Sequence, residues 1–220
     1  MNIGKNIAEI KRSLPAGVAL VAVSKTKPPE AIMEAYHSGH KIFGENKAQE
    51  LIHKQEVLPR NIEWHFIGHL QSNKAKYLAP FVYMIHSVDS FKILKTVNKE
   101  AAKNERTIPC LLQFHIAQES TKYGFSEEEA DAMLSSAAFK ACKNIEVAGV
   151  MGMATFTDDE NQVRREFRRL KQIFVHMKDH FFRDNPAFKE ISMGMSNDYV
   201  WAVEEGSTMV RIGSEIFGER

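Results

Sequence analysis

A (β/α)8 TIM barrel, formed as a single α/β domain over residues 1–220, is the fold class that the sequence predicts. Eight short apolar runs alternate with segments of helical periodicity, at an average repeat of about 27 residues. Two of these runs are nearly continuous in apolar side chains, as expected for strands buried on both faces of a parallel sheet. No linker, low-complexity segment or charge run divides the chain. An open doubly wound sheet is the alternative, but regular repeats favour a closed barrel.

The eight predicted strands are each followed by a helix or a helical turn. They are Val18–Ser24, Lys41–Gly44, Ile62–Ile67, Val82–His86, Ile108–His115, Ile145–Met151, Glu190–Met193 and Thr208–Ile212. The first and fifth of these are the two nearly continuous apolar runs.

Helices are predicted between the strands from their caps and their apolar spacing. An additional N-terminal helix over Ile3–Leu14 is expected to cap the bottom of the barrel. Pro28-Pro29 opens the helix over Ala31–Tyr36, because proline is favoured at the first helical position. A capping box, Ser126–Glu129, precedes the helix over Ala130–Ala138.

The longest helix is predicted to begin at Asp158 or Asp159 and to run to about Phe182. Its apolar stripe consists of Val163, Phe167, Leu170, Phe174 and Met177. Two arginine pairs on this helix, Arg164-Arg165 and Arg168-Arg169, are interpreted as a solvated face.

Composition excludes several classes of protein. Lys plus Arg number 29 and Asp plus Glu number 28, so the net charge of +1 gives no basic field for nucleic acid. The two cysteines, Cys110 and Cys142, are too few for a disulfide framework, and Cys110 is expected to be a buried free thiol. The N-terminus lacks the apolar core of a signal peptide, and no run has the length of a membrane span. We expect a cytoplasmic protein.

Two Gly/Ser turns near the C-terminus indicate phosphate binding. Met195-Ser196 follow the seventh predicted strand and Gly213-Ser214 follow the eighth, where barrels of this class often bind a phosphate. Glycine lets the backbone approach the anion, and serine hydroxyls and main-chain N–H groups donate hydrogen bonds. A helical turn over Ser214–Phe217 would direct its positive end at the phosphate. A single such pair is ordinary turn chemistry, whereas two at these positions are more specific.

Lys25 ends the first predicted strand and is expected at the barrel mouth. Strand alternation places Val21, Val23 and Lys25 on one face. Lys27 would share this face if the strand continued, but Pro28 ends it. Partial burial lowers the pKa of a lysine and frees the amine to condense with an aldehyde. An imine-forming lysine beside two phosphate turns predicts pyridoxal 5'-phosphate (PLP); a surface lysine is the alternative.

Further polar residues are placed near the same mouth. Arg211, at the end of the eighth strand, can donate a hydrogen bond to the pyridine nitrogen or form a salt bridge across the mouth. Asn46 can bond the ring hydroxyl or cap the next helix. His65 and His69 are four residues apart, but they lie on a strand that runs into a turn, so no metal site is expected.

These residues fall in motifs that resemble the YggS/PROSC family of PLP homeostasis proteins over nearly the whole chain. The motifs are Val23–Pro28, Phe43–Asn46, Trp64–Lys74, Ser87–Ser90, Ser192–Ser196 and Gly206–Gly213. The resemblance implies a barrel like the N-terminal domain of alanine racemase, which binds PLP covalently and influences vitamin B6 pools without established catalysis. The predicted protein is a monomer with PLP-dependent apoenzymes as possible recipients.

Roles carried over by position from the family cover eight residues. Lys25 forms the imine, Asn46 lies near the cofactor, Ser196, Gly213 and Ser214 contact the phosphate, Arg211 faces the pyridine nitrogen, and Met193 and Gly194 line the same pocket. After the fifth strand the chain departs from the family, with His115 and Gln118 where Asn and Gly are expected. Thr155–Thr157 after the sixth strand is also atypical.

Three functions compete at this point. The first is a PLP carrier or regulator that uses Lys25. The second is a weak amino-acid racemase, which needs acid–base groups on both faces of the α-carbon. In alanine racemases the second base is a tyrosine from another domain; since this chain ends at Arg220, an efficient racemase is not expected. A surface adaptor, resting only on the arginine pairs, ranks last.

Overall fold

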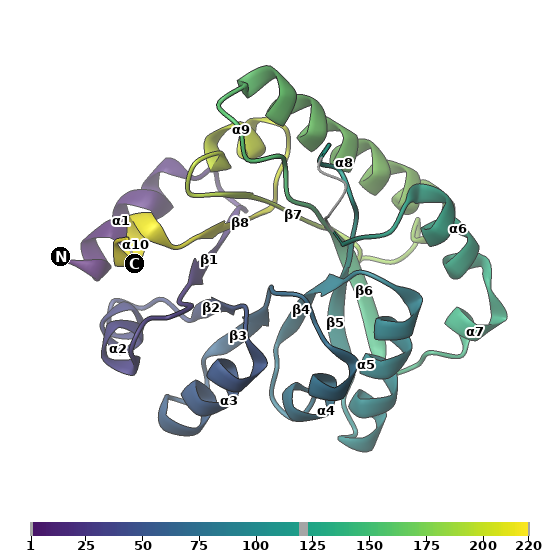
Figure 1. Cartoon of the computed structure of the whole chain (residues 1–220), viewed down its shortest axis with the longest axis horizontal. Coiled ribbons are helices and arrows are strands. Elements are labelled where there is room, and N and C mark those ends of the chain that lie inside the picture. Colours follow the sequence, from purple (N-terminus) through teal and green to yellow (C-terminus); the bar gives the residue numbers. More distant parts are fainter. Residues whose placement is uncertain (1, 119–122, 220) are drawn as a thin grey trace.

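Eight parallel strands pair in chain order and close on themselves, with β8 hydrogen-bonded to β1 (Figure 1). The computed structural model describes residues 2–118 and 123–219. The strands are β1 Ala19–Val23, β2 Ile42–Glu45, β3 Glu63–Phe66, β4 Met84–Val88, β5 Ile108–Gln113, β6 Ile145–Met151, β7 Glu190–Met195 and β8 Met209–Ile212. The predicted (β/α)8 barrel is therefore confirmed, with strand ends that differ from the prediction by two residues at most.

Helices surround this ring of strands (Figure 1). They are α1 Ile3–Ser13, α2 Pro29–His37, α3 Ala48–Val57, the 3-10 turn η1 Ser72–Lys74, α4 Ala75–Leu78, α5 Phe91–Lys103, α6 Glu127–Ser135, α7 Ala137–Lys140, α8 Glu160–Phe181, α9 Tyr199–Glu204 and α10 Ser214–Phe217. Ser136 interrupts the predicted helix over Ala130–Ala138, because its hydroxyl accepts from Phe139 N and starts α7. Asp159 caps α8 by accepting from Gln162 N.

Strand alternation separates two layers of core. A small cluster that includes Val21, Leu111, Met151 and Met209 fills the lumen. A larger apolar cluster lies between the strands and the helices. Val21 points into the lumen. Because side chains alternate along a strand, Val23 and Lys25 are expected on the same face, toward the mouth of the barrel.

The N-terminal helix α1 lies in the outer ring beside α2 and α10, and not across the bottom of the barrel as expected (Figure 1). Asn6 Nδ2 donates to Ile216 O over 3.0 Å, and Ile3 N donates to Glu34 Oε1 over 2.8 Å. The physical reason is that α10 has only four residues and leaves part of the wall uncovered. The buried residues Ile3, Ile7 and Ile10 supply that missing apolar face.

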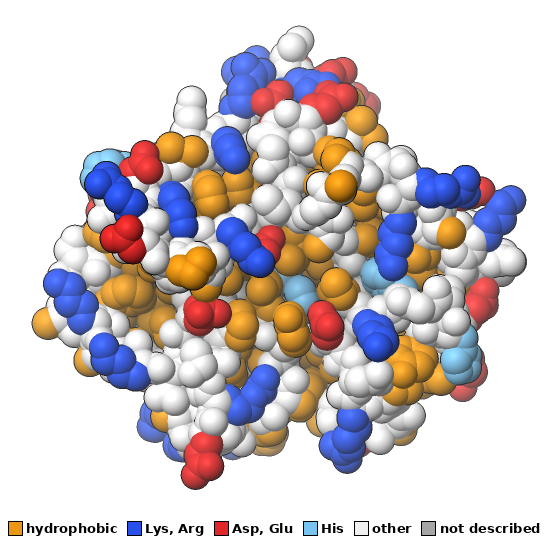
Figure 2. Space-filling view, turned by 180° about the vertical axis from the view of Figure 1, so that it is seen from behind, with side chains coloured by type: hydrophobic (Ala, Val, Ile, Leu, Met, Phe, Trp, Pro, Cys, Tyr) orange, Lys and Arg blue, Asp and Glu red, His pale blue; other side chains and the backbone are white. Residues whose placement is uncertain are grey.

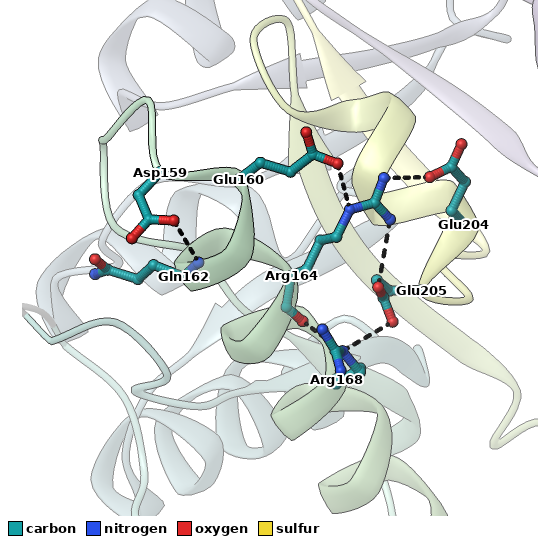
Figure 3. Close-up of polar contacts among 7 residues, drawn as sticks. All are labelled: Asp159, Glu160, Gln162, Arg164, Arg168, Glu204 and Glu205. Carbon is teal, nitrogen blue, oxygen red and sulfur yellow. Dashed lines mark hydrogen bonds and ion pairs between the residues drawn. The ribbon is translucent and has the colours of Figure 1, made fainter.

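Arg164 lies on the partly exposed face of α8 predicted for the arginine pairs, and there it forms an ion-pair network (Figure 3). Its guanidinium pairs with Glu160 on the same helix and with Glu204 and Glu205 at the end of α9. Arg168 adds a second pair to Glu205, at 3.3 Å. This network fastens α9 to α8, whereas the neighbouring arginines are exposed as predicted.

Side chains of both signs are scattered over the face of the molecule shown in Figure 2. This mixture agrees with the balanced composition and gives that face no single-sign field. Cys110 is a buried free thiol, as expected. Within residues 2–118 and 123–219, no helix is long and apolar enough to cross a membrane.

Candidate cofactor site at the barrel mouth

A cavity of about 230 Å³ lies at the carboxyl ends of β1, β2, β7 and β8. Six of the eight predicted site residues line it: Lys25, Asn46, Ser196, Arg211, Gly213 and Ser214. Arg211 belongs to β8, and the other five come from the segments after β1, β2, β7 and β8. The closed barrel brings them together at one end. Val23, Ile67, Met153 and Met195 give the cavity apolar walls.

Met193 and Gly194 do not line this cavity, and here the structure differs from the expectation. Met193 is fully buried in the outer core between strands and helices. Gly194 packs against α9, where an added Cβ would lie 2.6 Å from the Cβ of Ala202. The register of β7 shifts between Ser192 and Met195, so Met195 reaches the cavity wall in their place.

The two lysines after β1 have different surroundings. Lys27 borders the cavity, but its Nζ donates to the carbonyl oxygens of Phe217, Gly218 and Glu219 at 3.0 to 3.1 Å. Lys27 therefore ties the C-terminal segment to the barrel mouth. Lys25 is half-buried and lies on the cavity wall. The choice of Lys25 over Lys27 as the imine lysine remains a prediction, since both side chains line the cavity.

A buried ionic cluster holds the backbone on both sides of Lys25. Lys54 of α3 donates to Ser24 O at 2.8 Å and to Glu45 Oε1 at 2.7 Å, while Ser24 Oγ donates to the same carboxylate oxygen. Glu50 accepts from Lys54 Nζ and from the backbone N–H of Thr26, each at 2.6 Å.

Thr26 has φ of 64°, a conformation that β-branched residues rarely adopt. Strain of this kind persists only where the surroundings enforce it, and the hydrogen bond from Thr26 N to Glu50 does so here. The lysine that faces the cavity is consequently carried on a rigid turn rather than on a loose loop.

The phosphate turns meet across the end of the barrel. Gly213 N donates to Ser196 Oγ over 3.4 Å, which joins the turn after β8 to the turn after β7. A Cβ at Gly213 would lie 3.1 Å from the carbonyl oxygen of Val23, so the backbone is closely packed there. The predicted helical turn is present as α10, which begins at Ser214 on the cavity wall.

Arg211 is buried beneath these turns. Its guanidinium donates to Ser192 Oγ at 2.6 Å and to Gly152 O at 3.1 Å. Burial lowers the pKa of Arg211 to about 10, with Asp198 acting in the opposite direction. The side chain therefore remains a cation at neutral pH and can only donate hydrogen bonds. Both described hydrogen-bond acceptors of the guanidinium are neutral, while the charge of Asp198 acts on it electrostatically.

The polar contacts of His86 below the cavity were missed by sequence reasoning, which considered His65 only as a metal ligand. His86 Nδ1 lies 3.0 Å from Ser192 Oγ, and His86 Nε2 lies 2.8 Å from His65 Nδ1. All three side chains are buried. The signal in the sequence was strand alternation: His86 shares the lumen face with Met84, and a polar residue there needs a partner.

His69 lies apart from His65 and pairs with Asp89 over 2.9 Å, while its ring stacks on Tyr123. The atypical loops after β5 and β6 contact each other, because Gln118 N donates to Thr155 Oγ1. Thr155 in turn donates to Glu166 of α8. The two departures from the family pattern are thus structurally coupled.

The fold and the cavity together define a class of protein: a phosphate-binding (β/α)8 barrel with a lysine at its mouth. Residues 1–220 match the family model described as "Alanine racemase, N-terminal domain". The chain belongs to that family and, within it, to the pyridoxal phosphate homeostasis proteins, as the motifs predicted.

Relatives that carry the name "Pyridoxal phosphate homeostasis protein" are similar over nearly their full length. The protein from Aquifex aeolicus is 39% identical over 202 residues, covering 91% of this chain and 86% of the relative. The human protein is 38% identical over 228 residues, covering 97% of this chain and 81% of the relative.

A solved structure of PipY from Synechococcus elongatus PCC7942 with PLP bound has a TM-score of 0.88 and 32% identity. The match covers 98% of this chain and all of PipY. Alanine racemase from E. faecalis has a TM-score of 0.75 at 16% identity, with 58% of that chain covered, and so shares the fold alone.

Proposed function

We propose that this protein binds PLP covalently through Lys25 and takes part in intracellular PLP and vitamin B6 homeostasis. The observation that carries the proposal is the convergence of Lys25 with Ser196, Gly213 and Ser214 in one cavity. The names of the relatives and the PLP-bound PipY structure support the same cofactor. Residues 1–220 are proposed to act as one PLP-binding domain.

The residues of the cavity fit the chemistry of PLP. Ser196, Ser214 and the main chain at Gly213 would hold the phosphate, and the cationic Arg211 offers a donor to the pyridine nitrogen. The buried side-chain oxygen of Asn46 has no hydrogen-bond partner among the described residues. Because buried polar groups are normally paired, its amide is suited to bond a polar group of a ligand.

When bound, the cofactor would supply an aldehyde carbon, and Lys25 is the residue that would hold it covalently. The protein's own residues orient and retain it: the turn over Ser24 to Thr26 fixes the lysine backbone, and Lys27 holds the C-terminal segment against the mouth. Arg211 can donate a hydrogen bond but cannot accept one, so it would disfavour protonation of the ring nitrogen that it faces. A ring with an unprotonated nitrogen withdraws electrons weakly. Such a ring suits a protein that holds the cofactor better than one that catalyses reactions with it.

We propose a role without efficient catalysis. Racemisation requires acid–base groups on both faces of the reacting carbon. Beside Lys25 and the cationic Arg211, two titratable side chains line the cavity among the described residues: Lys27, whose Nζ is held by three carbonyl oxygens, and Glu219 of the C-terminal segment. No histidine, tyrosine or cysteine is among the described lining residues. Weak racemisation of an amino acid is the competing activity, and it is tested together with binding.

The experiment is the visible absorption spectrum of the protein with PLP, before and after borohydride, followed by peptide mapping. We expect a yellow species that is trapped on Lys25 and absent in Lys25→Ala. Lys27→Met is the matched control and should keep the adduct. An adduct on another lysine, or no visible species, would contradict the proposal. Turnover of D- or L-alanine by the loaded protein would assign the racemase function instead.

A protein that holds PLP needs recipients for the cofactor. We propose that the protein works in the cytoplasm as a monomer and passes PLP to PLP-dependent apoenzymes. Sedimentation with and without PLP tests the monomer. Transfer is tested by activating an apoenzyme with the loaded protein in the presence of a trap for free PLP; activation no faster than from free PLP contradicts it.

A further inference from the structure

A chain of buried polar side chains crosses the barrel lumen below the cavity. It runs from Arg211 on β8 to Ser192 on β7, then across to His86 on β4 and His65 on β3. The three links measure 2.6, 3.0 and 2.8 Å. Each side chain is at most 4% exposed, so solvent does not compete for these hydrogen bonds.

The guanidinium fixes the direction of the first link, and we assign the other two links in the direction that pairs the hydroxyl proton of Ser192. A guanidinium only donates, so Ser192 Oγ accepts from Arg211. The serine hydroxyl is then free to donate to His86 Nδ1, and His86 Nε2–H donates to His65 Nδ1. In each of the three hydrogen bonds, the donated proton points along the chain from Arg211 toward His65. His65 ends the chain, with an Nε2 that has no partner among the described residues.

Both histidines are neutral in this arrangement. Burial lowers the pKa of His65 to about 3. It also lowers the pKa of His86 well below its usual range, with His65 and Arg211 adding to the effect. A proton on His86 Nδ1 would face the serine oxygen and remove the acceptor that the hydroxyl needs. The neutral chain is therefore the one that pairs the hydroxyl proton of Ser192.

We propose that Ser192 and His86, supported by His65, are positioning residues that aim the guanidinium of Arg211 at the ring of the bound cofactor. This inference rests on the proposed PLP site. Arg211 has two described acceptors, Ser192 Oγ and Gly152 O, which hold two of its nitrogens. With the direction of Ser192 fixed by His86, the guanidinium keeps one orientation below the cavity.

The test uses Ser192→Ala and His86→Leu, with Ser87→Ala as the matched control. Ser87 is equally buried and adjacent to His86, but its hydroxyl has no partner among the described residues. Each variant is loaded with PLP, and three quantities are measured: the position of the visible band, the Kd for PLP, and the site of the borohydride adduct. Circular dichroism checks that each variant is folded.

We expect Ser192→Ala and His86→Leu to keep the adduct on Lys25, because a separate network holds the backbone of Ser24 and Thr26 on both sides of that lysine. Their visible band should move, and PLP should bind about tenfold more weakly, the effect of one charge-assisted hydrogen bond. Ser87→Ala should match the parent. A merely structural role would lower the stability of Ser192→Ala and His86→Leu and leave the band of bound PLP in place.

A second measurement keeps the inference testable where a variant fails to fold. Long-range ¹H–¹⁵N spectra of the PLP-free parent should show His65 and His86 as neutral Nε2–H tautomers. The opposite tautomer of His86, or unchanged spectra and affinity in folded Ser192→Ala and His86→Leu, would overturn the positioning role. A parent that forms no adduct at all would overturn the proposed function, which is a distinguishable result.

Discussion

Lys54 Nζ lies 2.7 Å from Glu45 Oε1, and their side chains are only 4% and 0% exposed. The pair lies between α3 and the barrel, outside the cavity, yet both members bond to Ser24, the residue before Lys25. An ion pair closed to water is weak evidence for net stabilisation, because desolvation offsets the attraction. What the pair does fix is the position of the turn that presents Lys25.

Removing the cation of this pair is expected to be costly. Lys54→Met keeps the length of the side chain but leaves the Glu45 carboxylate buried, where desolvation already raises its pKa. Breaking a buried pair from one side typically costs about 3 to 5 kcal/mol. We expect a loss of this size in the free energy of unfolding, measured in urea, and slower attachment of PLP to Lys25.

Lys103→Met is the control for this substitution. Lys103 pairs with Glu100 at 2.8 Å, but its side chain is 57% exposed. An exposed pair contributes at most about 1 kcal/mol, so this variant should unfold nearly like the parent and bind PLP at the same rate. Equal losses in the two variants would show that the Lys54 cluster has no special role.

Stability is expected to fall in mild acid because of buried histidines. His40, which donates to Ile42 O at 2.8 Å, has its pKa lowered to about 4, chiefly by burial and also by Lys11. Burial lowers the pKa of His65 to about 3. The unfolded chain takes up these protons near pH 6.5, whereas the native state does not. Stability is therefore full above pH 6.5 and decreases as the pH falls toward 4.

Each such histidine lowers the free energy of unfolding by up to about 1.4 kcal/mol per pH unit in that window. The measurement is the urea midpoint of His40→Gln and of the parent between pH 7 and pH 4. The variant should lose less stability than the parent over this range. His53→Gln, at an exposed position, should follow the parent. Parallel curves for His40→Gln and the parent would contradict the assignment.

Much of the barrel and of the cavity was predictable because strand alternation is a local property. The period of two placed Lys25 on the same face as Val21, and the order of the strands placed Ser196 beside Gly213. Met193 was expected on the cavity wall, but the structure places Met195 there. The register of β7 shifts after Ser192, and no pattern in the sequence indicates this shift.

The networks around the cavity were not predictable for a different reason. Lys54 has the sequence context of an exposed helical lysine, and its burial depends on the packing of α3 over the ends of β1 and β2. His86 and Ser192 are 106 residues apart and meet only across the closed lumen. Contacts of this kind require the radius and stagger of the barrel, which periodicity does not supply.

Arg164 is expected to hold α9 in place without affecting the chemistry of the cavity. Arg164→Gln removes its pairs with Glu204 and Glu205 (Figure 3), so the melting temperature should fall. The network is partly exposed and salt screens it, so the difference from the parent should shrink in 1 M salt, where the Debye length is about 3 Å. Arg165→Gln, at an exposed position of the same helix, is the control and should melt like the parent. A difference that persists in salt would assign Arg164 a packing role.

Gly68 leaves room for the backbone of Asn46 because glycine has no side chain. A Cβ on Gly68 would lie 2.2 Å from Asn46 O and 2.7 Å from its Cα, so alanine there must displace the backbone of Asn46. Overpacking of this kind costs about 1 to 3 kcal/mol. Because Asn46 lines the cavity, we expect Gly68→Ala to weaken PLP binding as well as stability.

The control for Gly68→Ala separates these two effects. Gly17 lies in an exposed turn with φ of 90°, and a Cβ there would meet no atom within 4 Å beyond its chain neighbours, so alanine adds backbone strain alone. That strain costs about 1 kcal/mol or slightly more. Gly17→Ala should thus lower the urea midpoint while the Kd for PLP stays at the parent value. If Gly68→Ala also left the Kd unchanged, the Asn46 backbone would have no part in holding the cofactor, and the amide of Asn46 would have to be removed from the proposed site.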